Sequence, residues 1–174
     1  MRNIMGFFSK FFKKKTTQVM GKDQIFSPAN GTLKSLESLG DGVFSEKILG
    51  EGFVVESEDG KIYAPVGGKL VTLFPTKHAY GIETSNGLNV LVHVGIDTVN
   101  LNGEGFSTDL TQGQPINPGQ LLATVDLDVV RNANLNPAIV LIVTKDSRLQ
   151  PEAFDTTERT VTTNDVIVSQ FKAA

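Results

Sequence analysis

Alternating hydrophobic and polar residues predict two short strands in the middle of the chain. The strands span residues 79–84 and 88–94, and the Asn86-Gly87 pair between them is a strong signal for a two-residue hairpin turn. The second strand carries aliphatic residues at every other position, and we expect these four to form its core face: Leu88, Val90, Val92 and Val94. The pattern therefore predicts an antiparallel hairpin with one buried face.

The opposite face of this hairpin holds both histidines of the chain. If Asn86 and Gly87 form the turn, Tyr80 lies opposite His93, and His78 is the diagonal neighbour of His93 on the same face. Diagonal neighbours lie about 7 to 8 Å apart between Cα atoms, within reach of two imidazole rings. We therefore expect the two rings to converge on one small group, whereas a slip by one residue would separate them.

The same register surrounds the histidines with the apolar side chains of Leu91, Tyr80 and Ile82 and puts Glu83 on the core face. An apolar face with two histidines is unusual for a surface that meets only solvent. This face therefore predicts either a docking surface for another protein or a surface that a second sheet covers.

Short apolar segments separated by turn residues predict five further strands, at residues 53–56, 69–74, 121–125, 138–143 and 160–168. Residues 26–33 and 63–70 share one pattern of aromatic, small, Pro, Gly and Leu positions at an offset of 37 residues, which predicts two copies of one strand-turn-strand unit. Asp126 is expected to cap a short helix that runs to Arg131. The predicted fold class is all-β, an antiparallel β-sandwich or barrel-sandwich hybrid with an internally duplicated motif and short helical turns.

Composition and charge narrow the range of functions. The length of 174 residues predicts one globular domain, residues 23–174, preceded by a tail. Residues 23–174 hold ten of the 16 basic residues and all 19 acidic ones, a formal charge of -9. Such an acidic domain argues against nucleic-acid binding and for a basic protein partner. The chain has no cysteine, which excludes disulfides and thiolate metal ligands and fits a cytoplasmic location.

Residues 1–22 predict a separate unit. Five apolar residues recur at the spacing of one helix face, while basic residues occupy the other positions: Ile4, Phe7, Phe8, Phe11 and Phe12. This pattern predicts an amphipathic helix that attaches residues 1–15 to an anionic membrane surface, followed by a linker. A helix docked on its own domain is the alternative. A signal peptide is not expected, because lysines interrupt the apolar residues and no small-residue cleavage site follows.

Two neighbouring histidines fit three kinds of chemistry. A catalytic zinc usually needs three protein ligands, so an Asp or Glu would have to join the pair. Acyl hydrolysis would need a serine and a carboxylate, but the chain has no nucleophile-elbow sequence. A phosphohistidine relay needs one ring to attack a phosphoryl group and a second to stabilise its oxygens. ATP is not expected as the donor, because the sequence has no phosphate-binding glycine motif.

Four segments resemble the glucose-type IIA component of the bacterial phosphoenolpyruvate-dependent sugar phosphotransferase system: residues 64–68, 74–79, 91–99 and 103–106. The resemblance covers about residues 23–168. It implies that His93 carries the phosphoryl group on its ε nitrogen, that His78 assists, and that Thr76 hydrogen-bonds to the assisting ring. It also implies a set of residues that contact partner proteins: Asp41, Phe44, Phe74, Leu91 and Asp97. Leu91 stands where the family usually has phenylalanine.

The resemblance further implies the partners. Phosphorylated HPr would donate the phosphoryl group, and the IIB domain of a IIB/IIC sugar permease would accept it, at the inner face of the membrane. The unphosphorylated form would bind regulatory target proteins. No cofactor is required, although a zinc ion shared between His78, His93 and a partner's carboxylate is similar to family behaviour. Three alternatives remain: a zinc-dependent hydrolase on a related β fold, a purely regulatory binding module, and a lipoyl-type carrier, whose hairpin turn should present a lysine.

Overall fold

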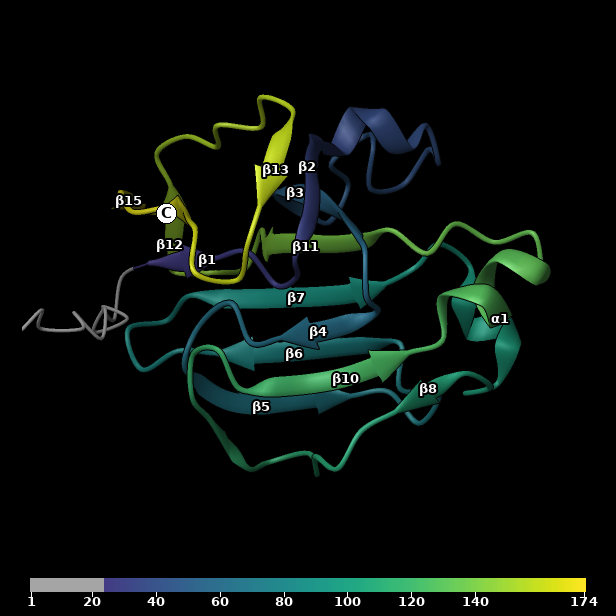
Figure 1. Cartoon of the computed structure of the whole chain (residues 1–174). Helices are drawn as coiled ribbons and strands as arrows, with labels where there is room; N and C mark the ends of the chain where they lie inside the picture. The colour runs from purple at the N-terminus through teal and green to yellow at the C-terminus, as the bar shows by residue number, and fades with distance from the viewer. Residues whose placement is uncertain (1–23) are drawn as a thin grey trace, which may run out of the picture.

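The computed structural model describes residues 24–174, whose regular secondary structure is almost entirely β (Figure 1). The strands are β1 Ile25–Phe26, β2 Gly31–Ser35, β3 Gly50–Ser57, β4 Lys61–Tyr63, β5 Gly68–Leu73, β6 Ala79–Glu83, β7 Asn89–Val94, β8 Phe106–Ser107, β9 Pro115–Ile116, β10 Leu121–Val125, β11 Ile139–Thr144, β12 Leu149–Pro151, β13 Arg159–Val161, β14 Val166–Val168 and β15 Phe171–Ala173. Three short helical segments join them: η1 Leu36–Leu39, η2 Thr98–Leu101 and α1 Leu127–Asn132. The predicted all-β class is confirmed. The amphipathic helix expected within residues 1–22 lies outside the described residues.

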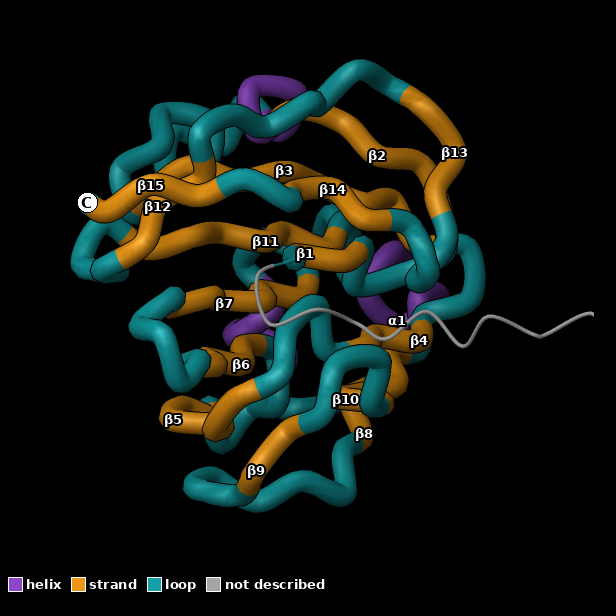
Figure 2. Tube along the Cα trace, turned by 90° about the vertical axis from the view of Figure 1, so that its left-hand side faces the viewer, coloured by secondary structure: helices purple, strands orange, loops and turns teal. Residues whose placement is uncertain are grey.

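The strands form one large sheet and three small ones. The large sheet has eight antiparallel strands in the order β13-β2-β3-β11-β7-β6-β5-β9. The strands β4, β10 and β8 form a second layer, and Figure 2 shows this layer across from β5, β6 and β7. Two-stranded sheets β1-β14 and β12-β15 complete the described fold. The arrangement is a sandwich of antiparallel sheets, as the sequence predicts.

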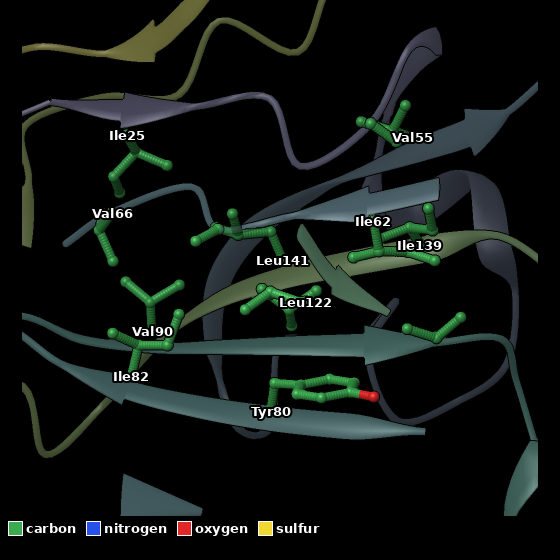
Figure 3. Close-up of a cluster of buried hydrophobic side chains, with 14 of the residues drawn as sticks. Ile25, Val55, Ile62, Val66, Tyr80, Ile82, Val90, Leu122, Ile139 and Leu141 are labelled. Carbon is green, nitrogen blue, oxygen red and sulfur yellow. The ribbon is translucent and has the colours of Figure 1, made fainter. Parts of the chain in front are cut away.

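The core lies between these layers. Figure 3 shows its side chains converging from both sides, with Ile82 and Val90 from the large sheet, Leu122 from the second layer and Ile25 from β1. The aliphatic residues predicted to form the core face of the second hairpin strand are all buried there: Leu88, Val90, Val92 and Val94. Burial of this apolar surface is the main force that holds the layers together.

The hairpin that carries the histidines has a different turn from the one predicted. Thr84 donates its backbone N–H to the carbonyl of Leu88, and its hydroxyl oxygen accepts the N–H of Leu88 at 3.0 Å. The turn therefore contains three residues, 85–87, with Gly87 at a φ of 89°. The strands pair one residue out of the predicted register, so that Ala79 rather than Tyr80 lies opposite His93.

This shift exchanges the two faces of β6. Tyr80 and Ile82 point into the core opposite Val92 and Val90, whereas the predicted register places them beside the histidines. Glu83, expected on the core face, is exposed instead. The corrected register removes the burial of a charged carboxylate, which the predicted one required.

The predicted internal duplication is confirmed. The first aromatic residue of one copy donates its N–H to the proline carbonyl of the other copy, and the reverse also holds: Phe26 to Pro65 at 2.9 Å and Tyr63 to Pro28 at 2.7 Å. In each copy a short strand, a proline turn and a longer strand follow in order, β1-β2 and β4-β5. The two units therefore pack as reciprocal partners near the centre of the fold.

Two further predictions have different outcomes. Asp126 caps α1 by accepting the backbone N–H groups of Asp128 and Val129, as expected. The single strand expected at 160–168 is wrong, because a turn separates β13 from β14, closed by the N–H of Asp165 and the carbonyl of Thr162 at 2.9 Å. Thr-Thr-Asn-Asp is a run of turn-forming residues, which outweighs the valines on either side.

A second, smaller apolar cluster lies on the outer face of the large sheet. It contains Leu36, Phe44, Val54, Ala138, Val140 and Ile142, with Leu91 and Ile96 packed against it. The segment between β2 and β3 thereby covers this part of the sheet, as seen at the top of Figure 1. The same segment brings Asp41 and Phe44 close to the histidines. Within residues 24–174, no helix is long and apolar enough to cross a membrane.

Candidate functional site

His93 lies in β7 with its side chain on the outer face of the large sheet. Val92 and Val94 on either side of it are buried in the core, so the alternation of the strand directs His93 away from the core. Its ring Nδ1 is 2.8 Å from the backbone carbonyl oxygen of Gly95. A carbonyl only accepts hydrogen bonds, so Nδ1 carries the proton and Nε2 keeps a free lone pair. This is the tautomer that a nucleophile acting through Nε2 requires.

The backbone conformation of Gly95 points its carbonyl oxygen toward Nδ1 of His93. Gly95 has a φ of 82°, and a Cβ at this position would lie 2.3 Å from Cγ2 of Thr98 and 3.0 Å from the carbonyl oxygen of Asn136. Only glycine fits both the conformation and the space. Gly95 is not among the site residues predicted from the sequence, although a glycine two residues after a strand histidine is the signal that could have indicated it.

His78 precedes β6 and is almost fully buried, with 4% of its surface exposed. Its Nδ1 lies 2.6 Å from the hydroxyl oxygen of Thr76, so the contact with Thr76 expected from the resemblance is present. When the Thr76 hydroxyl donates to Nδ1, the proton of the His78 ring sits on Nε2. The His78 ring can then donate a hydrogen bond through Nε2.

The two rings converge, as the sequence predicts, but for a different reason. Their centroids are 4.9 Å apart and their planes meet at 81°. His78 is not a diagonal neighbour within a regular ladder, because it lies in the turn before β6. Lys77 adopts a φ of 58° in that turn, which redirects the chain ahead of His78. The irregular turn places both rings on one face, called the histidine face below.

Two phenylalanines pack on the histidine pair, Phe44 from the segment between β2 and β3 and Phe74 from the turn after β5. The Phe44 ring lies 5.0 Å from the His93 ring, and the Phe74 ring lies 5.2 Å from the His78 ring, measured between centroids. Phe44 is buried, whereas Phe74 is 43% exposed. These contacts restrict the orientation of both imidazoles and leave an apolar edge around them.

The two acidic residues expected at the site differ in their contacts. Asp41 accepts the backbone N–H groups of Phe44 and Ser45, so it orders the turn that presents Phe44. Burial alone would raise the pKa of the Asp41 carboxyl, but the N–H groups of Ser45 and Phe44 outweigh it and lower the pKa. Asp97 is exposed at the start of η2. The negative charges of both carboxylates favour the protonated form of His93 and so act to raise its pKa.

Leu91 lies half-buried on the same face as His93, two residues before it in β7. It packs against the second apolar cluster, as Ile96 does. Large apolar side chains in neighbouring segments are exposed, namely Val43, Ile48, Leu49, Phe74 and Val99. The predicted apolar surroundings of the histidines therefore exist, although Phe44 and Phe74 rather than Tyr80 and Ile82 form them.

The environment of the histidine pair keeps both rings neutral. Burial, together with the neighbouring His78, lowers the pKa of His93 to about 4 against the opposing effects of the Gly95 carbonyl, Asp41 and Asp97. Burial also lowers the pKa of His78. The rings are thus uncharged at neutral pH, and His93 keeps the lone pair that a nucleophile needs.

We expect the His93 ring to titrate near pH 4 instead of near its usual value of 6.5. The folded pKa lies below the unfolded one, so the neutral ring stabilises the fold above pH 6.5, and this stabilisation is lost as the pH falls toward 4. Proton NMR titration suits this test, because the chain has only two histidines. A midpoint near 6.5 for His93 would contradict the expectation.

A metal ion would find only part of a site here. Among residues 24–174, no group of three or more His, Asp, Glu or Cys side chains could hold a metal ion. The histidine pair supplies two ligands at most, while catalytic zinc usually takes three from the protein. Residues 24–174 alone therefore do not fit a zinc centre.

Comparisons with known proteins place the chain in a family. A family model described as "phosphoenolpyruvate-dependent sugar phosphotransferase system, EIIA 1" matches residues 23–149. The glucose-specific EIIA component of Mycoplasma capricolum is 48% identical over 107 residues, 62% of this chain and 70% of the relative. That of Halalkalibacterium halodurans is 39% identical over 128 residues, 74% of each chain. The solved structure of glucose permease IIA from Mycoplasma capricolum has a TM-score of 0.74 and 38% identity, covering 83% of this chain and 93% of that chain.

Other relatives are much longer. The glucose-specific EIICBA component of Streptococcus pneumoniae is 42% identical over 128 residues, 74% of this chain but 18% of the relative. The glucosamine-specific EIICBA component of Bacillus subtilis is 45% identical over 120 residues, 69% of this chain and 19% of the relative. This chain thus spans less than a fifth of the length of both proteins. The chain belongs to the glucose-type IIA components of the phosphoenolpyruvate-dependent sugar phosphotransferase system, which are phosphotransferase components with a phosphohistidine intermediate.

Proposed function

We propose that Nε2 of His93 accepts a phosphoryl group from phosphorylated HPr and that the chain passes this group to the IIB domain of a sugar permease. The observation that carries the proposal is the hydrogen bond between Nδ1 of His93 and the Gly95 carbonyl, which leaves Nε2 as the nucleophile. His78, Thr76 and the aromatic contacts then have distinct roles around that atom.

In the proposed acceptance step, the lone pair of His93 Nε2 forms a bond to phosphorus. The P–N bond to the donor histidine breaks, and its electron pair returns to the ring of the donor. The proton of His93 stays on Nδ1 and keeps its hydrogen bond to the Gly95 carbonyl, which stabilises the positive charge that the phosphorylated ring gains. His78 donates a hydrogen bond from Nε2 to a phosphoryl oxygen, where negative charge redistributes during transfer.

The face around the pair suits transient docking of proteins. Exposed apolar residues such as Phe74 and Val99 offer contact area, and Asp41 and Asp97 offer negative charge to a basic partner. The EIICBA relatives, in which a segment like this chain belongs to a longer component, support the IIB/IIC permease as the acceptor. Transfer between HPr and such a permease would take place in the cytoplasm, at the inner face of the membrane.

A regulatory role is part of the same proposal. Phosphorylation adds about -1.5 to -2 charges at neutral pH. On the histidine face this charge would favour release of an apolar or acidic target, so that the unphosphorylated form binds such targets more tightly. A zinc ion shared with a target would need that target to supply the ligands beyond His78 and His93. The zinc-dependent hydrolase is not favoured, because a hydrolase would need a complete site within the chain.

The proposal is tested with labelled phosphoenolpyruvate, the general phosphotransferase enzyme and HPr. We expect one phosphoryl group per chain, labile in acid as a P–N bond is, and its loss on addition of a IIB domain. Incorporation without HPr, or an acid-stable label, would overturn the proposed reaction.

Membrane association of residues 1–15 is a separate proposal that rests on the sequence. Phenylalanines and lysines alternate there in the pattern of a peripheral anchor. Replacing Phe7 and Phe11 by serine is expected to reduce binding to vesicles of anionic lipid at least tenfold, since each loses a large apolar surface. Replacing Thr16 and Thr17 by serine provides the control. Equal vesicle binding by both double variants would reject the anchor.

A further inference from the structure

The hydroxyl group of Tyr80 is a buried polar group that the proposed relay does not use. Tyr80 is fully buried within the apolar core, and Figure 3 shows its ring among the aliphatic side chains with the hydroxyl at its far end. A hydroxyl in such surroundings requires a hydrogen-bond partner. The Tyr80 hydroxyl donates to the backbone carbonyl of Lys77 at 2.9 Å. Its partner is thus the residue immediately before His78.

Lys77 needs such support because of its backbone conformation. Its φ of 58° lies in the left-handed region, which residues other than glycine, asparagine and aspartate rarely adopt. The N–H of Lys77 donates to the carbonyl of Phe74 at 2.8 Å, which closes the turn on one side. The Tyr80 hydroxyl holds the carbonyl of Lys77 on the other. The peptide plane between Lys77 and His78 is therefore fixed from the core.

The Tyr80 hydroxyl also lies next to the second layer of the fold. The side chain of Thr108 is close enough to influence the pKa of Tyr80, and the Thr108 hydroxyl donates to the carbonyl of Leu122 in β10 at 2.6 Å. Burial raises the pKa of Tyr80 to about 12, and Thr108 opposes this rise, so the hydroxyl stays protonated and remains a donor near neutral pH. The second layer thus lies behind the turn that Tyr80 holds.

We propose that Tyr80 is a positioning residue for His78. The Tyr80 hydroxyl holds the Lys77 carbonyl and thereby fixes the His78 ring against His93. This role rests on the proposed function of the histidine pair. Because the two ring centroids lie only 4.9 Å apart, a small shift of the turn changes the direction of the hydrogen bond that His78 can donate. Misplacement of a catalytic group by about 1 Å can slow a reaction by up to about a hundredfold.

The test is Tyr80→Phe in the full chain, which removes one oxygen atom and keeps the ring. Tyr63→Phe is a matched control, since Tyr63 is the only other tyrosine and lies in β4, outside the histidine face. We expect Tyr80→Phe to accept the phosphoryl group on His93 but to transfer it to a IIB domain about tenfold more slowly. The His78 ring should titrate closer to 6.5, because a loosened turn admits water to it. Tyr63→Phe should match the unmodified protein in both measurements.

Two readouts separate this proposal from the proposed function. The NMR titration of His78 requires no phosphoryl transfer, so it tests the position of the ring even if His93 is never labelled. An unchanged titration and transfer rate in Tyr80→Phe, with only a lower thermal midpoint, would mean that the hydroxyl merely stabilises the fold and would overturn the positioning role.

A second variant tests whether the hydroxyl acts through Lys77. Glycine adopts positive φ at little cost, so Lys77→Gly in the Tyr80→Phe background should favour the original turn without the hydrogen bond. We expect it to recover part of the lost transfer rate and to return the His78 titration toward that of the unmodified protein. No recovery in either measurement would contradict the proposed route through the Lys77 backbone.

Discussion

Replacing His93 by alanine is expected to abolish labelling of the chain from phosphoenolpyruvate. The substitution removes the ring whose Nδ1–H donates a hydrogen bond to the Gly95 carbonyl and whose Nε2 is therefore free to act as the nucleophile. His78, the only other histidine, is almost fully buried and has its Nδ1 on Thr76, so we expect no replacement nucleophile. The measurement is label per chain after incubation with the general enzyme and HPr.

The fold should survive this substitution, which makes the result interpretable. His93 is partly exposed on the outer face of β7, while the neighbouring core positions Val92 and Val94 keep their contacts. Leu121→Ala serves as the control, because Leu121 is 47% exposed on β10 in the second layer and this variant should label normally. Acid-labile label retained at full stoichiometry in folded His93→Ala would show that the phosphoryl group resides elsewhere.

The sequence predicts the core face of β7 correctly because the alternation within one strand does not depend on its partner. The aliphatic residues from Leu88 to Val94 indicate a buried face whichever residue lies opposite. The prediction for the faces of β6 depends instead on the expected two-residue turn, and that turn is wrong. The alternation of β6 itself, with Tyr80 and Ile82 as its large apolar residues, would have indicated the observed burial.

The turn differs because side-chain contacts override the dipeptide signal. Asn86-Gly87 commonly forms a two-residue turn. Here the Thr84 side chain accepts the N–H of Leu88 and donates to the Asn86 side chain, which makes room for a third residue in the loop. Thr84 is buried, and in the observed turn its hydroxyl both accepts and donates a hydrogen bond. Such competition depends on tertiary burial and is not visible in the order of residues.

The side chains of the candidate site could be predicted from the sequence, but the groups that hold them in position could not. The histidine pair stands out in the sequence, and the family resemblance supplies Thr76, whose contact with His78 is present. The carbonyl of Gly95 and the hydroxyl of Tyr80 act through backbone orientation, which follows from how separate segments pack. Residue types and spacing carry little information about a carbonyl direction, so these supports emerge only in three dimensions.

Replacing His78 is expected to separate acceptance of the phosphoryl group from its onward transfer. In His78→Ala, His93 keeps its tautomer and its Phe44 contact, so label from HPr should still appear. The donor to the phosphoryl oxygens is lost, and removal of one such donor typically slows a reaction by about 10² to 10³-fold. We expect that loss in the rate at which a IIB domain removes the label, measured by rapid quenching.

His78→Gln distinguishes a hydrogen-bond role from a charge role. Burial lowers the pKa of His78, so near pH 7 the ring assists as a neutral donor, and a glutamine amide offers a neutral donor of similar length. Glutamine should therefore recover part of the transfer rate that alanine loses, whereas a charged imidazolium would not be replaced by an amide. Thr76→Val should reduce transfer less than His78→Ala, because it frees the ring without removing it. Equal transfer rates in the alanine variant and the unmodified protein would exclude His78 from the reaction.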